Sequence, residues 1–292
     1  MEETENSKQT LIERVNITNN VRNNARSPTQ ILEKSTEEKL CCCCCMDYDL
    51  TITEYKLFND LKKKVIPPYD EKNPSHEYNL EQLLKKAKSI LGNDNDKEDI
   101  SNKSTTNTNN TNDEDVLIWR KLGFQTGNPR TDFRAGGLFS LEFMNYFANN
   151  HENEFTNMIN EDYFTYALVC IRLCYLMRVY LFLLPQDEIK INIKFQKNAL
   201  ASRKELKNFC YFLWGDSNLL FNMASVVLTF IYQKFISQQN KGNKESNYLI
   251  IEPIISSAIQ SLKNYLNDIN SNQDLLTKLK TKYRENFLKI LK

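Results

Sequence analysis

Apolar residues recur every three or four positions through most of the chain after residue 50, and this spacing predicts amphipathic helices. Pro67-Pro68 ends the first helix and Gly92 ends the second. The sequence shows neither internal repeats nor an alternation of strands and helices. The pattern therefore predicts an all-α fold. The predicted helical segments are 50–66, 79–91, 138–147, 163–184, 209–214, 219–236, 248–269 and 274–291.

Two tracts break this pattern, because they are rich in Asn, Asp, Glu, Ser and Thr and poor in large apolar residues. Such segments cannot bury enough apolar surface to offset the entropy lost on ordering. We predict that residues 1–40 are disordered and that residues 93–114 form a disordered Asn-rich insertion within the domain. The predicted organisation is a disordered arm, residues 1–46, followed by a single helical domain, residues 47–292, with its core at about 50–240.

Two of the predicted helices could contact a membrane. The apolar run 163–184 is long enough to span a bilayer, for which about 20 residues are needed, but it contains Arg172 and Arg178. Each arginine would cost about 2.5–3.5 kcal/mol at the bilayer centre, so we predict a buried core helix whose arginines are marginal or paired. The basic helix 274–291 could lie on an anionic membrane or a partner, and we favour packing on its own domain.

The overall composition is that of a soluble globular protein, since 41% of the 292 residues are hydrophobic, 26% are charged and the net charge is +1. This near-neutral balance gives no support to nucleic-acid binding. The acidic start, Met1-Glu2-Glu3, is unlike the basic and then apolar start of a secretory leader. We therefore expect a cytoplasmic location, where disulfide bonds are rare.

Five of the eight cysteines are consecutive: Cys41, Cys42, Cys43, Cys44 and Cys45. Their spacing does not match that of zinc ligands, and no histidine lies near them. Three interpretations stay open: a low-complexity run of inert thiols, S-acylation that binds the arm to a membrane, or a metal or redox role. Stable anchoring usually takes two acyl chains, and a run of five thiols could carry them. The protein would then be peripheral on a membrane.

Several signatures of catalysis are missing. The sequence has no phosphate-binding glycine motif of the form G-x-x-x-x-G-K-[ST] or G-x-G-x-x-G, and its two histidines are not at metal-ligand spacing. For His76 we predict a hydrogen bond at a helix start, and we assign Cys170, Cys174 and Cys210 to the core. We therefore predict no cofactor, no metal and no self-sufficient enzyme.

Four of the seven glycines lie in the stretch 119–147, so backbone shape matters more there than elsewhere. The Asn128-Pro129 pair predicts a turn. We predict a helix end at Trp119, then a glycine-rich loop, then a new helix for which Thr131 or Asp132 is the N-cap or the first-turn acid.

Arg134 follows this turn, in a setting that would present its side chain. A guanidinium is permanently charged and planar, and it offers forked donors to phosphate oxygens. An arginine supplied in trans raises GTP hydrolysis by small GTPases about 10³–10⁵-fold, because it stabilises charge in the transition state. From the residues alone, a structural pair of Arg134 with Asp132 or another acid is the favoured interpretation.

A succession of short motifs carries a resemblance to a known family. The motifs are Trp119, Gly123-Phe124-Gln125, Pro129, Thr131-Asp132-Phe133-Arg134, Ala135-Gly136-Gly137 and Tyr146-Phe147. Flanking matches are Tyr69-Asp70 and Asn73-Pro74-Ser75-His76-Glu77 before the tryptophan, and Tyr163-Phe164-Thr165-Tyr166-Ala167 after it. In this order the chain resembles the ELMO (engulfment and cell motility) domain family over about residues 50–240. The single helical domain is thereby identified as an ELMO-type domain.

The resemblance implies a function. Family members that stimulate GTP hydrolysis by Arf-family GTPases resemble this chain in carrying the arginine. The larger scaffolds of the family act with Rac exchange factors. The chain looks like a GTPase-activating protein for a GTP-loaded Arf or Arl GTPase, with Arg134 as the catalytic residue. The implied partner-binding residues are Trp119, Gly123, Phe124, Gln125, Pro129, Thr131, Asp132, Phe133 and Gly137. The alternative is a non-catalytic adaptor that holds a GTPase or an exchange factor through the same surface.

Two residues depart from the family's pattern. Ala135 stands where a glycine is expected, which costs about 1 kcal/mol or more only if φ there is positive. Phe139 stands where a small residue is common, and its ring could alter the choice of partner.

Overall fold

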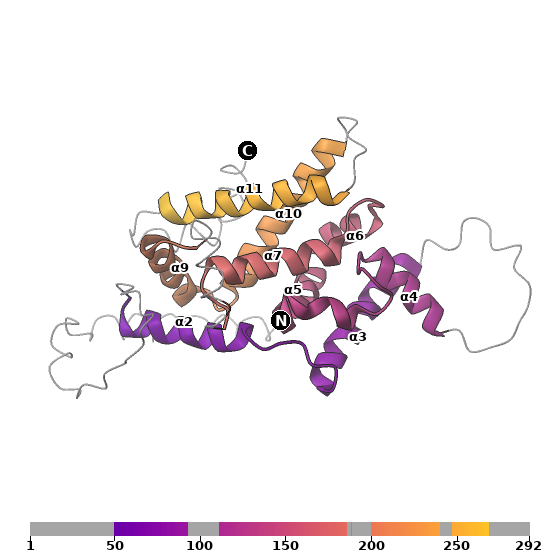
Figure 1. Cartoon of the computed structure of the whole chain (residues 1–292), viewed down its shortest axis with the longest axis horizontal. Coiled ribbons are helices and arrows are strands. Elements are labelled where there is room, and N and C mark those ends of the chain that lie inside the picture. The colour runs from indigo at the N-terminus through magenta and orange to yellow at the C-terminus, as the bar shows by residue number, and fades with distance from the viewer. Residues whose placement is uncertain (1–49, 93–110, 186–187, 189–199, 240–246, 269–292) are drawn as a thin grey trace, which may run out of the picture. The chain divides into compact units, whose positions relative to one another are not determined.

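The structure, a computed structural model, describes residues 50–92, 111–185, 188, 200–239 and 247–268. Every regular element in these ranges is a helix, as Figure 1 shows, and the predicted all-α fold is confirmed. The described residues belong to one compact unit that begins at Asp47. The elements are α2 (Ile52–Val65), α3 (Pro74–Leu91), α4 (Thr111–Lys121), the 3-10 helix η3 (Pro129–Arg134), α5 (Gly137–Asn150), α6 (Glu152–Asn160), α7 (Tyr166–Tyr180), α9 (Arg203–Gly215), α10 (Leu219–Gln239) and α11 (Asn247–Asp268).

Several predicted features lie outside the described residues. They are the disordered arm, the cysteine run Cys41–Cys45, residues 93–110 of the insertion and the basic helix 274–291. The prediction of disorder is wrong for residues 111–114, because α4 already begins at Thr111. Asp113 and Glu114 lie in its first turn, where negative charge stabilises the helix N-terminus.

Side-chain caps explain where the first helices begin. At α2 the Glu54 N–H donates to the Thr51 hydroxyl (3.2 Å), and the Thr51 N–H donates to the Glu54 carboxylate (2.8 Å), which makes a capping box. α3 begins earlier than predicted, at Pro74. The Asn73 side chain accepts from the Ser75 N–H (3.0 Å), and proline suits the first helical position.

α6 was not predicted at all, whereas the other later helices differ from prediction mainly at their ends. α9 begins at Arg203 rather than 209, because Ser202 and Glu205 form a second capping box. α7 is shorter than the predicted run 163–184, and Phe182 takes a left-handed φ of 57° just after its end. α10 and α11 agree with the predicted 219–236 and 248–269 to within one turn.

α5 is the central helix of the domain. It packs against α2, α3, α6, α7 and α10, and Figure 1 shows it within the bundle. Nine of its fourteen residues are buried. A helix that is apolar on nearly all sides needs neighbours on all sides. Because η3 directly precedes α5, the glycine-rich loop ends on the central helix of the domain.

α7 is a buried core helix, as predicted, and its two arginines are paired. The Nε of Arg172 donates to the Glu252 carboxylate of α11 (3.1 Å). The guanidinium of Arg178 donates to two backbone carbonyls of the loop before α5. Both charges are therefore compensated inside the domain rather than placed in a bilayer.

Among the described helices, one meets the length and hydropathy expected of a membrane span. It is α10, which the sequence analysis did not single out, and not the run 163–184. About half of its most apolar window, 56%, is buried in the domain. The core helices of soluble proteins share this property, and α10 packs against α5, α7 and α11.

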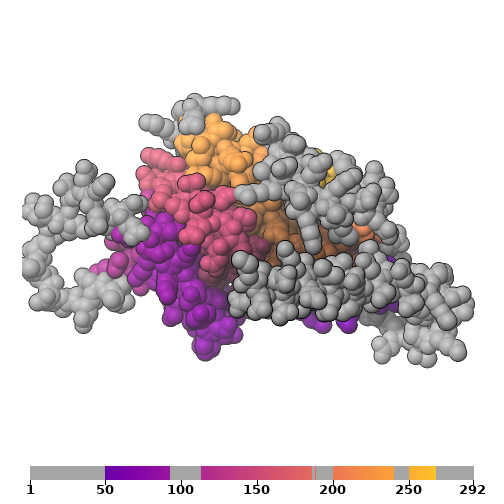
Figure 2. All heavy atoms as spheres, turned by 180° about the vertical axis from the view of Figure 1, so that it is seen from behind, coloured from indigo at the N-terminus to yellow at the C-terminus, as the bar shows by residue number. Residues whose placement is uncertain are grey.

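Segments that are distant in sequence are joined at the surface of the domain. Figure 2 shows α3 (purple) beside the α6–α7 region (pink). Lys86 of α3 and Glu152 of α6 form an ion pair there, with Nζ and Oε1 2.7 Å apart. α2 packs along α9. Both of the first two helices are thereby attached to the later part of the fold.

The buried cysteines give a test of the packing. Cys170, Cys174 and Cys210 are buried. Burial raises the pKa of Cys210 to about 12 and also raises the pKa values of Cys170 and Cys174. Since the thiolate is the reactive form, we expect these thiols in a chain with Cys41–Cys45 changed to serine to react with DTNB at least about a hundredfold more slowly at pH 8 than in denaturant. Rapid reaction of any thiol in native buffer would contradict this packing.

Candidate functional site

The glycine-rich loop begins at a regular helix ending. The Gly123 N–H donates to the Arg120 carbonyl (2.9 Å) and the Phe124 N–H donates to the Trp119 carbonyl (3.1 Å). These two bonds make a Schellman motif, which requires a left-handed residue, and Gly123 has a φ of +91°. A Cβ at this position would lie 2.6 Å from the Cα of Thr165. Glycine is therefore needed for both conformation and space.

Four aromatic rings form a small core beneath the loop. The Trp119 and Phe124 rings meet edge to face with centroids 5.4 Å apart, which is the apolar contact that usually accompanies this helix ending. The Phe124 and Phe133 centroids are 5.7 Å apart, and Phe133 and Tyr69 are 4.9 Å apart. These rings give the loop its shape from the inside.

Hydrogen bonds fix the turn that leads into η3. The Asp132 carboxylate accepts from the Gln125 N–H (2.8 Å) and from the Thr131 hydroxyl (3.2 Å). The Asn128 side chain accepts from the Arg130 N–H (3.2 Å) and caps η3. Neither Thr131 nor Asp132 is an N-cap, because both lie within η3 and α5 begins only after it. Asp132 does lie in the first turn of η3, which agrees with the prediction of a first-turn acid.

An ion pair ties the loop to the start of α3. The Nε of Arg130 donates to the two Glu77 oxygens (3.0 and 3.2 Å), and the Tyr69 hydroxyl also donates to Glu77. The bonds from Arg130 lower the pKa of Glu77, while burial and the bond to Glu77 raise the pKa of Tyr69. The Asp70 N–H donates to the Nδ1 of His76 (3.0 Å), so the hydrogen bond predicted for His76 at a helix start is confirmed.

The far end of the loop is held from inside the domain. Arg178 of α7 is only 4% exposed, and its Nη1 donates to the carbonyls of Ala135 (3.3 Å) and Gly136 (3.0 Å). Gly137 has a φ of +63°. A Cβ at Gly137 would lie 3.0 Å from the Pro67 carbonyl oxygen and 3.2 Å from the Arg178 Nη1. The backbone here is enclosed by a buried cation and a neighbouring segment.

Arg134 lies between these fixed points and is itself free. Its side chain is exposed, and it has no hydrogen-bond or ion-pair partner among the described residues. The pair with Asp132 that the sequence favoured does not form, because Asp132 bonds back to Gln125 instead. The loop therefore presents a guanidinium from a rigid backbone.

The two departures from the family's pattern leave this geometry intact. Ala135 has a φ of −84°, so it carries no left-handed strain. Phe139 is 1% exposed, and its ring stacks on that of Phe221 with centroids 5.4 Å apart. Its ring points into the core and away from the exposed surface of the loop.

The other predicted partner-binding residues divide by exposure. Those with buried side chains or backbone are Trp119, Phe124, Pro129, Phe133 and Gly137. Their contacts shape the loop, and contact with a partner stays a prediction for them. The exposed or half-buried ones are Gly123, Gln125, Thr131 and Asp132. For these four, contact with a partner stays a prediction.

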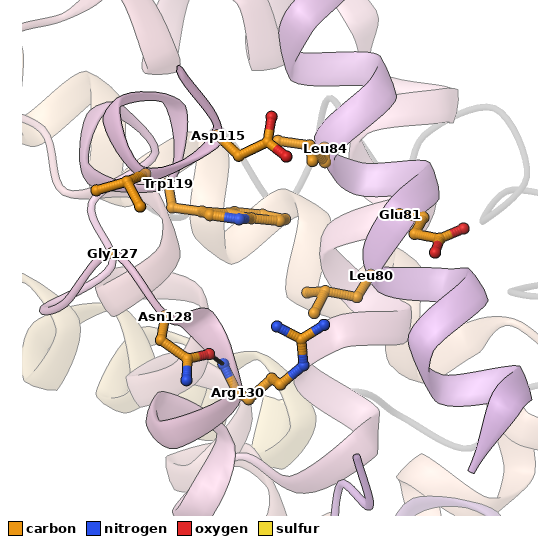
Figure 3. Close-up of a pocket in the computed structure, with 9 residues that line it drawn as sticks. Leu80, Glu81, Leu84, Asp115, Trp119, Gly127, Asn128 and Arg130 are labelled. Carbon is orange, nitrogen blue, oxygen red and sulfur yellow. Dashed lines mark hydrogen bonds between the residues drawn. The ribbon is translucent and has the colours of Figure 1, made fainter. Parts of the chain in front are cut away.

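A hollow of about 340 Å³ opens beside the loop, between α3 and α4. Figure 3 shows the Trp119 indole on one side of it and the Arg130 guanidinium on the other. Its lining residues are Leu80, Glu81, Leu84, Asp115, Val116, Trp119, Gly127, Asn128 and Arg130. Within the ranges that the structure describes, no three His, Cys, Asp or Glu side chains gather closely enough to hold a metal ion.

Comparison with known proteins identifies the family. The model of the ELMO/CED-12 family matches residues 59–214, which is more than half of the 292 residues. The chain belongs to the ELMO/CED-12 family. The matched region runs from α2 to α9 and includes the whole glycine-rich loop.

Individual relatives agree with this membership. Human ELMO domain-containing protein 2 is 25% identical over 219 residues, which cover 72% of this chain and 67% of that protein. The mouse protein of the same name is 29% identical over 147 residues, 48% of this chain and 43% of the relative. ELMO domain-containing protein A of Dictyostelium discoideum is 43% identical over 42 residues, 14% of this chain and 4% of the relative. No solved structure matches the chain.

Sequence reasoning missed the residues that hold the loop from outside it. Glu77 had been noted only as part of a motif, and Arg178 only as a charge in an apolar run. For Arg178 a signal existed, because a buried arginine requires acceptors and the loop offers backbone carbonyls. Nothing in the local spacing indicated that Arg130 would pair with Glu77, since these residues are distant in sequence.

The first glycine of the loop offers a direct test of its shape. We expect Gly123→Ala to lower the free energy of unfolding by about 2 kcal/mol or more, because it combines a left-handed φ with a backbone clash. Gly92→Ala is the matched control, since Gly92 ends α3 with a φ of −73° and open space around its Cα. Denaturant unfolding checks both. Equal stability of the two variants would contradict the role of Gly123.

Proposed function

We propose that this chain is a GTPase-activating protein for a GTP-loaded small GTPase of the Arf family, and that Arg134 acts in trans. The observation that carries the proposal is an exposed arginine without a partner among the described residues, on a loop whose backbone is fixed at both ends. The choice of the Arf family rests on the resemblance of the loop motif to family members with that activity.

The chemistry follows from the guanidinium. During GTP hydrolysis negative charge spreads over the oxygens around the transferred phosphoryl group, and a cation placed there lowers the barrier. Arginine suits this role because it stays charged and donates two parallel hydrogen bonds. Since Asp132 and Glu77 are occupied elsewhere, no described acid competes with phosphate for Arg134.

The fixed backbone contributes through entropy. A flexible loop would lose conformational freedom when it enters the GTPase active site, and this loss would weaken the interaction. Here the Schellman ending, the aromatic rings and Arg178 hold the backbone before a partner arrives. Only the side chain of Arg134 then has to be ordered.

Gln125 and Thr131 extend the proposed contact surface. Both are exposed polar residues of the same loop. Asp132 is half-buried and acts mainly on the loop itself through its bond to Gln125. We propose that the exposed pair contacts the GTPase, while the buried members of the motif keep the surface in shape.

We also propose that acylation of Cys41–Cys45 places the protein on a membrane. The five adjacent thiols provide more attachment sites than the two that stable anchoring by acyl chains needs. A cytoplasmic activator that is peripheral on a membrane would meet a membrane-bound GTPase at high local concentration.

Replacing Arg134 separates transition-state stabilisation from binding. We expect Arg134→Lys to reduce stimulated single-turnover hydrolysis at least about a hundredfold, with the affinity for the GTP-loaded partner nearly unchanged, because lysine lacks the planar fork. The measurements are hydrolysis and affinity across a panel of purified Arf and Arl GTPases, together with the melting temperature.

Arg120→Lys is the matched control, since Arg120 is an exposed arginine of the neighbouring α4. It should leave hydrolysis as in the parent. Full stimulation by Arg134→Lys would overturn the catalytic role. Binding without stimulation by the parent would favour the adaptor instead.

Changing all five cysteines of the run to serine tests the membrane proposal. The parent should fractionate with membranes and be released by hydroxylamine, which cleaves thioesters, whereas the serine variant should stay in the soluble fraction. Membrane binding that survives in the serine variant would show that the run is not the anchor.

A further inference from the structure

The hollow between α3 and α4 is bounded in part by η3, the element that carries Arg134. Gly127, Asn128 and Arg130 line the hollow, and Arg130 belongs to the same 3-10 helix as Arg134. At about 2 Å of rise per residue, the backbones of these two arginines are only about 8 Å apart along η3. A partner that meets Arg134 over a patch of usual interface size, about 800 Å² on each side, extends far enough to reach the hollow as well.

The walls of the hollow are partly apolar and partly polar. They include Leu80, Leu84, Val116 and Trp119, of which Leu84 and Val116 are half-buried and so remain partly open to solvent. The Trp119 indole N–H has no hydrogen-bond partner among the described residues. Its nitrogen is not among the fully buried unpaired atoms, so it keeps some exposure to solvent. Figure 3 shows the indole facing Arg130 across the open space. The hollow thus offers an apolar wall with one free donor.

Its size suits a protein side chain. A volume of about 340 Å³ is at the lower end of the range for small-molecule sites. The charge at its inner edge is already compensated, because Arg130 bonds to Glu77. An anionic ligand would have to compete with Glu77 for Arg130, whereas an apolar side chain with an acceptor at its end would not.

We propose that this hollow receives one large apolar side chain of the GTP-loaded GTPase and sets the affinity of the complex. This inference rests on the proposed function and assigns different roles to two parts of the interface. The hollow would bind equally before and during hydrolysis, so it acts on affinity, whereas Arg134 acts on the rate. A buried apolar anchor next to a polar loop is a common arrangement of binding hot spots.

Leu84→Lys places a charge in the apolar wall. We expect it to weaken binding of the GTPase loaded with a non-hydrolysable GTP analogue roughly 10- to 100-fold. Stimulated single-turnover hydrolysis at saturating concentration should stay within about twofold of the parent, because the transition-state contact is untouched. Arg134→Lys should show the opposite pattern, with its affinity kept and its rate lost.

Ile90→Lys is the matched control, since Ile90 is a half-buried apolar residue of the same helix that does not line the hollow. It should bind as the parent does. Equal weakening by Leu84→Lys and Ile90→Lys would overturn the proposal, because the effect would then come from general destabilisation. Unchanged binding by Leu84→Lys would overturn it while leaving the proposed function standing. If no GTPase of the panel binds the parent, both fail together.

Photo-crosslinking gives a second test that leaves the fold untouched. Glu81 is an exposed residue at the rim of the hollow, and p-benzoylphenylalanine at this position should crosslink to the bound GTPase on illumination. The same residue at Ile90 should not. A crosslink only within the chain would show that the hollow has an internal occupant and would overturn the proposal.

Discussion

The bond between the buried Arg178 guanidinium and the loop backbone is the contact on which the site depends. A cation removed from water needs hydrogen-bond acceptors, and the carbonyls of Ala135 and Gly136 provide them directly after Arg134. Arg178 belongs to α7, a core helix. The arginine and the loop are therefore mutually dependent, because each would leave the other with unpaired polar groups. This dependence connects the exposed loop to the packing of the whole domain.

The loop is fixed at its two ends by two left-handed glycines. Gly123 approaches the backbone of Thr165, and Gly137 approaches the carbonyl of Pro67. Between them Phe133 points inward onto the aromatic rings while the next residue, Arg134, points outward. The buried ring thereby decides the direction of the exposed side chain. Most residues of the family motif thus act on the loop itself, whereas the Arg134 side chain makes no contact among the described residues that would hold it there.

Much of the fold could be predicted from the sequence. Helical spacing gave the all-α class and most of the helices, although α6 was missed, and the concentration of glycine located the loop. The helix starts at Pro74 and Arg203 were missed because their caps precede the apolar pattern. Thr131 and Asp132 were assigned to the wrong helix because a 3-10 turn intervenes. Local spacing shows which face of a helix is buried but not what it meets, so the partners of Arg130 and Arg178 could come only from the structure.

The two arginines of η3 have different roles, and the difference matters for recognition. Arg130 is neutralised by Glu77, and Asp132 directs its charge at a backbone N–H. An anion that approaches this turn therefore finds a single uncompensated positive charge, at Arg134. If Arg130 were also free, a phosphate group could bind at either of two arginines four residues apart in η3. The ion pair between Arg130 and Glu77 removes that ambiguity. It leaves Arg134 as the arginine of η3 that an anion can bind.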